Sequence, residues 1–333
     1  MQKTISIIIA IFNRKDELFE LLNSLIAQTD KNFEVIIVDD GSSVDLLPTV
    51  ETFKEMLEIQ YFKKTNSGPG LSRNYGANRA KNDWLVFVDS DVIVEKDYIE
   101  NIKKNLEKTD CAAFGGADKA HKGFNILQEA ISYSMTSVFT TGGIRGSKKA
   151  VTRFQPRSFN MGVNKEIFLK IGGFSEMRIG EDPDLSMTIW ENGYQTAFFD
   201  NIGVYHKRRT DLGKFSKQVY QFGCARPILN QRHPNYVKPT FWFPTLFLLG
   251  YVAGILEYFL LHKGFVLACY GIYTFVIFFH ALLLTKNLAI AAQAIITTYI
   301  QMFSYGYGFL ESWVKLNILR MKPEEAFPKH FHK

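Results

Sequence analysis

Cysteine is scarce in this chain of 333 residues, which contains only three. They are Cys111, Cys224 and Cys269, and their wide spacing and odd number argue against a disulfide framework and a cysteine-based zinc site. Internal repeats and low-complexity linkers are also missing. The apolar run over residues 3–12 is interrupted at Ser6 and is followed by no small-residue cleavage site, so we interpret it as a buried strand rather than a signal peptide.

Charged residues are nearly absent from one long stretch of the sequence. They make up 22% of the whole chain, yet residues 241–314 contain only Glu257, Lys263, Lys286 and Glu311. The mean hydropathy of −0.05 is therefore an average over two unlike parts. We predict a normally charged domain over residues 1–235, a membrane segment over 236–314 and a basic tail over 315–333. The 29 Phe and 15 Tyr exclude a disordered chain.

Two segments in this stretch have the length of membrane-spanning helices. Residues 241–261 contain one charge and residues 264–285 contain none, and at a rise of ~1.5 Å per residue each can cross a hydrocarbon core of ~30 Å. The alternative is a buried pair of soluble helices, but long soluble helices carry a polar face, which these segments lack. We therefore expect a helical membrane hairpin, with residues 241–243 in the interfacial aromatic belt.

A third apolar segment, residues 288–310, is less uniform because it contains several Gln, Thr, Ser and Tyr side chains. Basic residues flank the membrane segment on both sides, and the positive-inside rule then places both flanks in the cytoplasm. An even number of crossings follows, so we favour two full spans with a re-entrant or interfacial third segment, while the length of 288–310 also suits three spans. The flanks explain much of the net charge of +6, and we expect no nucleic-acid partner.

The first 110 residues alternate between short apolar runs and segments with helical spacing of apolar residues. The apolar runs are 5–12, 33–38, 59–62 and 84–88, and the helical segments are 17–27, 50–57 and 71–80. Apolar strands that alternate with helices predict an α/β fold whose mostly parallel central sheet has flanking helices on both faces. Beyond residue 110 the pattern weakens, and we expect a helix over 124–135 and short elements over 159–163, 167–171 and 197–199.

Polar and acidic residues follow the ends of these strands, which is the edge where ligands bind in open α/β sheets. Asp89-Ser90-Asp91 comes directly after the fourth apolar run. Two carboxylates this close repel each other unless a cation lies between them, and Mg²⁺ or Mn²⁺ prefers oxygen ligands that it shares with phosphate. The alternative is a helix N-cap, a position that favours Asp and Ser.

Asp39-Asp40, followed by Gly and Ser, forms a second acidic edge after the second apolar run. In one interpretation these residues only form a strand-to-loop turn. In the other, a carboxylate accepts hydrogen bonds from a nucleotide base or ribose, and Phe12 at the end of the first run stacks on that base. Arg73 could pair with Asp39 or with phosphate through its planar guanidinium.

Seven short motifs, in this order, carry a resemblance to a known family. They are residues 6–13 (SIIIAIFN), 38–42 (VDDGS), 66–77 (NSGPGLSRNYGA), 87–91 (FVDSD), 159–162 (FNMG), 172–174 (GGF) and 180–182 (GED). Over roughly residues 3–226 the chain resembles a family 2 glycosyltransferase of the GT-A fold. Ala10 departs from the usual Pro, which loosens the turn into the nucleotide site. Residues 221–226 lack the QxxRW signature of processive synthases, which favours addition of a single sugar.

The resemblance implies an inverting transfer from a nucleotide-activated sugar. It places Asp39 at the base, Asp91 at a divalent metal and Asp89 near ribose or metal. It also implies that Asp182, with Glu181 beside it, takes the proton of the acceptor hydroxyl. For that pair, capping of a helix over 185–191 is the alternative.

The resemblance extends to further residues around this site. The expected nucleotide-sugar-binding residues are Phe12, Asn13, Asp39, Asp40, Arg73, Asp89, Ser90 and Asp91, and the expected ligands of Mg²⁺ or Mn²⁺ are Asp89, Asp91 and His206. A lone His is, however, more often a structural hydrogen bonder than a ligand. Arg153 and Arg157 could grip diphosphate or be solvated charges.

We therefore expect a membrane-anchored glycosyltransferase that moves one sugar from a nucleotide sugar, with UDP as the expected carrier, to a lipid-linked or other membrane-associated acceptor. The expected location is a bacterial inner membrane with the catalytic domain in the cytoplasm, and the expected role is cell-envelope polysaccharide synthesis. One alternative is a sugar-phosphate nucleotidyltransferase, but residues 13–16 contain no glycine for the phosphate loop of such enzymes. A glycosidase would not need the nucleotide-facing acidic edge. A catalytically degenerate membrane scaffold is the non-enzyme alternative.

Overall fold

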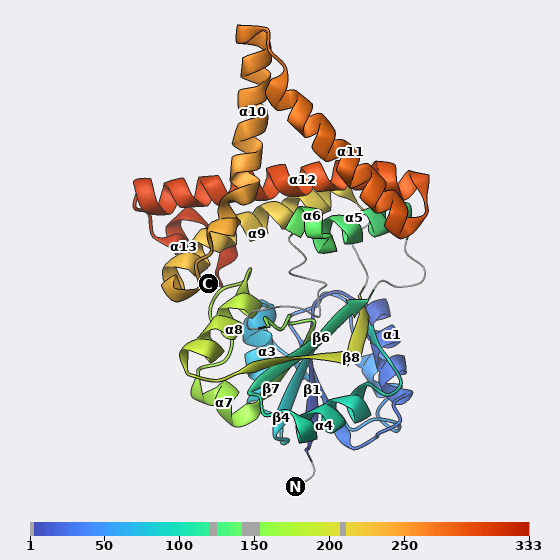
Figure 1. The fold of residues 1–333 in the computed structure, drawn as a ribbon. Helices are drawn as coiled ribbons and strands as arrows, with labels where there is room; N and C mark the ends of the chain where they lie inside the picture. The colour runs from blue at the N-terminus through green and yellow to red at the C-terminus, as the bar shows by residue number, and fades with distance from the viewer. Residues whose placement is uncertain (1–2, 120–124, 142–153, 207–210, 333) are drawn as a thin grey trace. The chain divides into compact units, whose positions relative to one another are not determined.

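A computed structural model describes residues 3–119, 125–141, 154–206 and 211–332 of the chain (Figure 1). The chain forms two compact units. The first unit contains residues 1–121, 148–207 and 329–333, and the second contains residues 122–147 and 208–328. The domain predicted over residues 1–235 therefore includes two segments, residues 122–147 and 208–235, that belong to the second unit. The last residues of the chain belong to the first.

Four parallel strands form one half of the eight-stranded sheet in the first unit. They are β1 (Ile5–Ile11), β2 (Phe33–Asp39), β3 (Ile59–Lys63) and β4 (Trp84–Asp89), in the spatial order β3-β2-β1-β4. All residues of β2 and all but one of β1 are buried, as expected for strands that are covered on both faces. The predicted parallel arrangement of these four runs is confirmed.

The other half of the sheet is mixed. It contains β7 (Asn160–Asn164), β6 (Ala113–Lys119), β8 (Thr196–His206) and β5 (Val92–Val94). β7 pairs antiparallel with β4 and β6, β6 pairs parallel with β8, and β8 pairs antiparallel with β5. The single strand β8 contains the expected strand 197–199 and ends at His206.

Six helices accompany the described part of this sheet. They are α1 (Lys15–Ile26), α2 (Leu47–Glu51), α3 (Pro69–Ala77), α4 (Tyr98–Lys108), α7 (Lys165–Lys170) and α8 (Glu181–Glu191). The helical spacing of leucines that predicts the first helix places Leu18, Leu21, Leu22 and Leu25 in the core. The sequence pattern is wrong about the helix over 50–57. α2 ends at Glu51, and single turns follow in which Phe53 donates to the carbonyl of Val50. α2 and these turns together bury Val50, Phe53 and Leu57, which have the spacing expected for one face of a helix.

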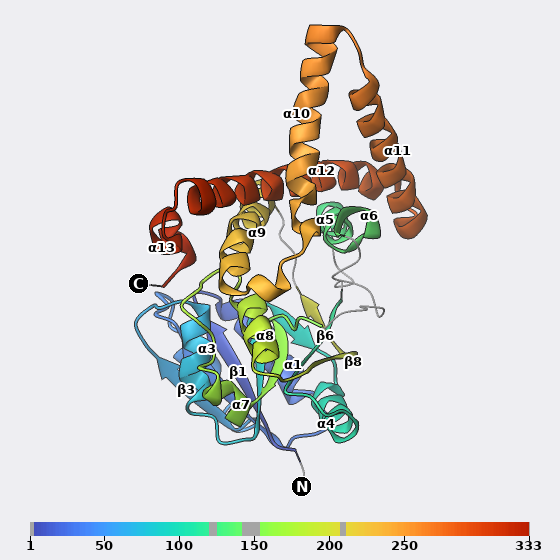
Figure 2. The ribbon, with the colours of Figure 1, turned by 60° about the vertical axis from the view of Figure 1, so that its left-hand side comes forward.

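The second unit is entirely helical where it is described. Its α-helices are α5 (Ile126–Thr136), α6 (Val138–Thr141), α9 (Leu212–Arg232), α10 (Phe243–Leu261), α11 (Phe265–Thr285), α12 (Leu288–Trp313) and α13 (Pro323–Ala326). Short helices η1 (Pro234–Tyr236), η2 (Pro239–Trp242) and η3 (Val314–Ile318) flank α10 and α12, and η4 (Pro328–His330) leads into the end of the chain. Within this unit, α12 packs along α9 and α5. Figures 1 and 2 show α10 and α11 as a hairpin that projects from this layer.

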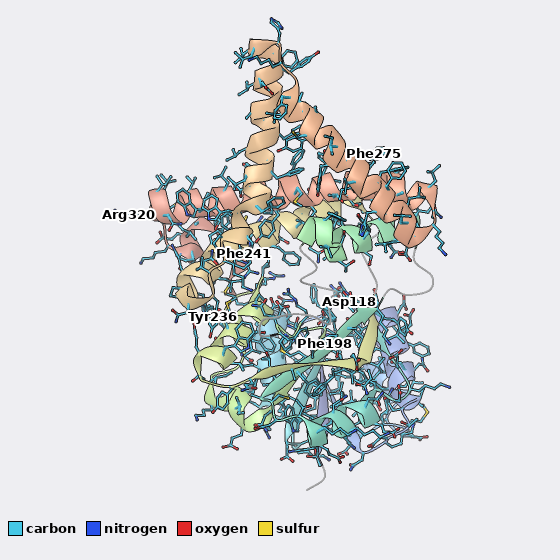
Figure 3. All side chains as sticks on the ribbon, in the orientation of Figure 1. Asp118, Phe198, Tyr236, Phe241, Phe275 and Arg320 are labelled. Atoms are coloured by element: carbon cyan, nitrogen blue, oxygen red, sulfur yellow. The ribbon has the colours of Figure 1, made fainter. Side chains whose placement is uncertain are left out.

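Three helical segments are long and apolar enough to span a membrane: Pro239–Leu261, Phe265–Thr285 and Leu288–Ile318. The first two expose most of their side chains. Phe275 on α11, for example, is 63% exposed and points away from its helix (Figure 3). The third is more buried because one of its faces packs on α9 and α5. The predicted apolar segments are therefore helical, and the third is the most enclosed.

Candidate active site

Three neighbouring parallel strands end together at one edge of the sheet. β1 lies between β2 and β4, with Ile11 opposite Asp39 and Ala10 opposite Asp89. The residues after these strands therefore meet at this edge, as the strand order requires. They include most of the predicted donor-binding residues: Phe12, Asn13, Asp40, Ser90 and Asp91.

Asp39 is fully buried, and both of its carboxylate oxygens accept hydrogen bonds. The backbone N–H of Ser42 donates to Oδ1 at 2.7 Å, and the hydroxyl of Tyr61 donates to Oδ2 at 2.8 Å. Burial raises the pKa of Tyr61, and the bond to Asp39 acts in the same direction, so the phenol remains a donor. The turn interpretation therefore describes the local geometry, and contact of Asp39 with a base stays a prediction.

Asp40 holds the loop that precedes α3. Its carboxylate accepts hydrogen bonds from the backbone N–H groups of Ser67 at 2.8 Å and Gly68 at 2.7 Å, and it forms an ion pair with Lys64. Asn66 donates to the backbone carbonyl of Asp40 at 2.8 Å. Gly68 has a φ of +88°, a conformation that glycine adopts without strain. Asp40 thus fixes the turn over residues 66–68.

Phe12 and Asn13 differ in how the fold uses them. Phe12 is 48% exposed, so its side chain is accessible at this edge. Asn13 has a φ of +56°, its backbone N–H donates to the Ser42 hydroxyl, and its Oδ1 accepts from the backbone of Ser43 at 2.8 Å. Asn13 therefore joins the loops that follow β1 and β2.

The structure excludes the helix-cap interpretation of Asp89-Ser90-Asp91, because Asp89 ends β4 and β5 begins only three residues later, at Val92. Each carboxylate is paired with an arginine. Arg73 Nη2 lies 2.7 Å from Asp89 Oδ1, and Arg14 pairs with Asp91. Sequence reasoning missed Arg14. Its signal in the sequence is its position three residues after the end of β1, the strand next to β4.

The predicted metal site is only partly described. Among the described residues, no group of three or more His, Cys, Asp or Glu is arranged to hold a metal ion. On β8, the backbone of His206 lies opposite Val92 of β5, and Val92 directly follows Asp91 in the chain. The structure does not describe the side chain of His206. Two carboxylates still fit Mg²⁺ or Mn²⁺, since such ions often bind to one or two carboxylates and complete their shell with phosphate oxygens and water.

Arg73 links this edge to the predicted base. Its guanidinium is buried, contacts Asp89 through Nη2 and lies 3.3 Å from Glu181 Oε1 through Nη1. The ring of Phe174 lies 5.3 Å from the guanidinium carbon. The sequence suggested Asp39 as a carboxylate partner of Arg73, but Arg73 pairs with Asp89 and Glu181 instead. Its two carboxylate partners come from β4 and α8, a pairing that no local pattern could show.

Glu181 and Asp182 form the first turn of α8, which follows Gly180 in a left-handed conformation. Neither side chain caps the helix, so the capping alternative is wrong. Burial raises the pKa of Glu181 to about 7, and the Asp182 carboxylate acts in the same direction while Arg73 opposes it. Asp182 Oδ2 lies 3.3 Å from Arg157 Nη1. Arg157 is thus held at the acidic turn, and Arg153 lies outside the described residues.

Comparison with known proteins identifies the family. A family model described as Glycosyl transferase family 2 matches residues 6–169. An uncharacterized glycosyltransferase from Haemophilus influenzae is 32% identical in an alignment of 220 residues that covers 62% of this chain and 70% of that protein. The chain belongs to glycosyl transferase family 2. Against relatives from Rickettsia felis and Rickettsia conorii, the match extends over 104 residues and only 17% of their length.

Two solved structures share the fold with this family member. Staphylococcus aureus TarS in complex with UDP-GlcNAc has a TM-score of 0.50 and 18% identity, with 92% of this chain and 91% of that chain covered. The mannosyltransferase PcManGT from Pyrobaculum calidifontis, in complex with GDP-Man and Mn²⁺, has a TM-score of 0.55 and 18% identity, with 88% and 86% covered. At this identity the likeness concerns the fold. The predicted GT-A fold, a sheet with flanking helices, is confirmed.

Proposed function

We propose that this family 2 glycosyltransferase is anchored in a membrane and moves one sugar from a nucleotide sugar to a lipid-linked or other membrane-associated acceptor, with inversion at the anomeric carbon. The observation that carries the proposal is the contact of Arg73 with both Asp89 and Glu181. This contact joins the acidic end of β4, where a diphosphate would bind, to the acidic turn that would receive the acceptor. Donor and acceptor chemistry therefore meet within one unit.

The donor would lie along the edge formed by β2, β1 and β4. In this proposal Phe12 stacks on the base, Asp39 accepts from its N–H group, and Asn13, Asp40 and Ser90 hold the surrounding loops. UDP is the proposed carrier, supported by the UDP-GlcNAc complex of TarS. PcManGT was solved in complex with GDP-Man, so GDP is the alternative carrier to test against UDP.

Asp89 and Asp91, with His206 as a further ligand, would hold Mg²⁺ or Mn²⁺ together with the diphosphate. The ion would supply positive charge to the leaving nucleoside diphosphate. Arg14 and Arg73 already place guanidinium groups beside these two carboxylates. When the donor binds, the same groups are close enough to the acidic edge to interact with diphosphate oxygens.

Asp182 would act as the general base. An acceptor hydroxyl is too weakly acidic to attack unaided near neutral pH, so a carboxylate opposite the leaving group must take its proton. Arg157 holds the Asp182 side chain through Oδ2, and Glu181, whose raised pKa favours its protonated form, is paired with Arg73. The two acids therefore have different partners, and we assign the proton-accepting role to Asp182, which contacts Arg157, rather than to Glu181, which is paired with Arg73.

The membrane anchor would consist of α10 and α11, with α12 lying in the interface. Residues 329–332, which follow α12 and α13, belong to the same unit as the catalytic site. They must therefore lie on the same side of the membrane as that site, which supports an even number of crossings. The predicted basic flanks support the same topology, with the catalytic unit in the cytoplasm. A bacterial inner membrane and a role in cell-envelope polysaccharide synthesis complete the proposal.

The donor assay tests the activity. Membranes that contain the full chain are incubated with a panel of UDP- and GDP-sugars, and transfer and nucleoside diphosphate release are measured. We expect one UDP-sugar to be consumed. Activity with a GDP-sugar and with no UDP-sugar would show that GDP, not UDP, is the carrier. Conversion of a sugar 1-phosphate and a nucleoside triphosphate to pyrophosphate would favour a nucleotidyltransferase, and no turnover of any donor would favour a scaffold.

Cysteine labelling tests the topology. In a variant without its native cysteines, Lys263→Cys at the tip of the α10–α11 hairpin should react with a membrane-impermeant maleimide added outside spheroplasts. Lys322→Cys, which follows α12, should react only after permeabilisation. Labelling of Lys322→Cys from outside would show three spans instead of two.

A further inference from the structure

The segment that follows the membrane helices returns to the catalytic unit and is fastened there. We call residues 329–332 the return segment. Phe331 forms an antiparallel bridge with Met177, and both side chains are buried. The backbone N–H of Arg178 donates to the carbonyl of His330 at 2.7 Å, and the N–H of His332 donates to the carbonyl of Glu176 at 2.9 Å. Two backbone bonds and an apolar pair thus hold the segment in one register.

The partner of this bridge is the loop that leads to the catalytic acids. Glu176, Met177 and Arg178 lie between Phe174, which contacts Arg73, and Gly180, which opens α8. The same loop also touches the start of α3, since a Cβ on Gly70 would lie 3.4 Å from the Cβ of Phe174 and 3.8 Å from the carbonyl oxygen of Met177. A segment fastened to this loop is therefore close to both the donor edge and the base.

His332 extends the contact to the donor edge itself. A Cβ built on Gly68 would lie 1.7 Å from His332 Cε1, so the imidazole ring occupies the space beside the Gly68 Cα. Gly68 also donates its backbone N–H to Asp40. The turn over residues 66–68 is thus in contact with both the Asp40 carboxylate and the His332 ring. His332 Nε2 is buried without a hydrogen-bond partner among the described residues, so packing rather than a polar bond from this nitrogen holds the ring.

We propose that the return segment is a working part of the donor site, in which His332 is a positioning residue for the turn over residues 66–68. This inference rests on the proposed function, because it assigns the turn to nucleoside diphosphate binding. His332 fills the space that the glycine leaves and so limits the conformations of the turn. Loss of the ring would leave Asp40 as the main constraint on the turn and would weaken donor binding. The reaction itself would proceed as before in enzyme that has bound its donor.

The surroundings of His332 favour its neutral form. Burial lowers the pKa of His332, and Arg178 and Lys64 act in the same direction, while Asp40 and Glu176 oppose them. A neutral ring packs against a peptide backbone without the cost of a buried charge. Near neutral pH the His332 ring is therefore in the uncharged form that suits its packed position.

The experiment uses the full-length chain in nanodiscs and compares His332→Ala, His332→Phe and Lys329→Ala. Lys329 is an exposed residue of the same segment and serves as the matched control. We expect His332→Ala to raise the donor KM and the Kd for UDP roughly tenfold, with kcat within about twofold. His332→Phe, which keeps a flat ring, should restore most of the affinity, and Lys329→Ala should leave both constants unchanged.

Hydrogen exchange provides a readout that does not depend on turnover. The amides of Ser67 and Gly68 should exchange faster in His332→Ala than in the wild type, while buried amides of β1 should not change. Unchanged exchange together with unchanged UDP affinity in His332→Ala would overturn the proposal. If the wild-type chain bound UDP but transferred no sugar, the proposed activity would fail and the role of His332 in nucleotide binding would stand. If it bound no nucleoside diphosphate, both would fail.

Discussion

Arg73 and Glu181 form a buried ion pair although 108 positions separate them in the sequence, with Nη1 3.3 Å from Oε1. Because Arg73 also pairs with Asp89, one guanidinium connects the end of β4 to the start of α8. A buried charge of this kind is strongly destabilising when its partner is removed. The pairing therefore ties the geometry of the acidic edge to the stability of the catalytic unit.

Removal of Arg73 should affect both stability and activity. Arg73→Ala leaves the Asp89 and Glu181 carboxylates without their cation, and we expect a loss of about 3–5 kcal/mol in the free energy of unfolding. Arg73→Lys keeps the charge but cannot bridge two carboxylates with a planar fork, so it should recover only part of this loss. Chemical denaturation and donor turnover measure the two effects.

The control for this series is Arg79→Ala. Arg79 is exposed and stacks on Tyr75, with its guanidinium carbon 3.4 Å from the ring centroid. Its loss should cost at most about 1 kcal/mol. Equal stability of Arg73→Ala and Arg79→Ala would show that the buried network is not formed as described.

Glu181 should make the catalytic unit less stable as the pH rises. Its pKa in the folded chain is raised to about 7 from an ordinary value of 4.5. A raised pKa gives a stabilising contribution that is complete below pH 4.5 and is lost as the pH rises through about 7. We expect Glu181→Gln to gain thermal stability relative to the wild type between pH 4.5 and pH 8, with Glu191→Gln as the control. A constant difference in Tm across this range would contradict the raised pKa.

The parts of the fold that sequence could predict are those with local patterns. The continuous apolar runs predict β1, β2, β3 and β4 because strands buried on both faces leave no polar alternation. The acidic residues after β2 and β4 predict the site edge because parallel strands end on the same side. α2 ends earlier than the helix predicted over 50–57, because single turns can bury apolar residues at the same spacing as a helix does.

The contacts that were not predicted join residues far apart in the chain. No periodicity connects Arg73 to Glu181, Arg14 to Asp91 or His332 to Gly68, since these pairs are set by the order of strands and by the path of the chain after α12. The two-unit division was hidden for the same reason. The composition of α9 is that of an ordinary soluble helix, yet α9 packs along α12.

Asp182→Asn should abolish most of the transfer without loss of donor binding. The amide has nearly the same shape but cannot take a proton from the acceptor hydroxyl, so we expect kcat to fall by about 10²–10⁴-fold. The Kd for UDP, measured by calorimetry, should change by no more than about twofold. Undiminished transfer would remove Asp182 from the mechanism, and a matching loss in Glu181→Gln would assign the base to Glu181.

Gly76→Ala should destabilise the catalytic unit through packing. A Cβ on Gly76 would lie 2.7 Å from Ile8 Cγ2 and 3.2 Å from Val38 Cγ2, because α3 lies directly against β1 and β2. We expect a loss of about 1–3 kcal/mol in the free energy of unfolding. Gly271→Ala on α11, where a Cβ meets nothing within 4 Å, is the control and should not be destabilising. Equal effects would mean that α3 can move away from the sheet at little cost.

Metal dependence should follow from the two paired carboxylates at the end of β4. We expect a chelator to abolish transfer and added Mg²⁺ or Mn²⁺ to restore it, because a hard cation offsets the repulsion between Asp89, Asp91 and a diphosphate through oxygen ligands. Asp91→Asn should raise the metal concentration needed for half-maximal activity, while Asp110→Asn at an exposed position should not. If transfer continues at the same rate in chelator, then Arg14 and Arg73 alone neutralise the leaving diphosphate. In that case the loss of either arginine should reduce kcat more than the loss of Asp91.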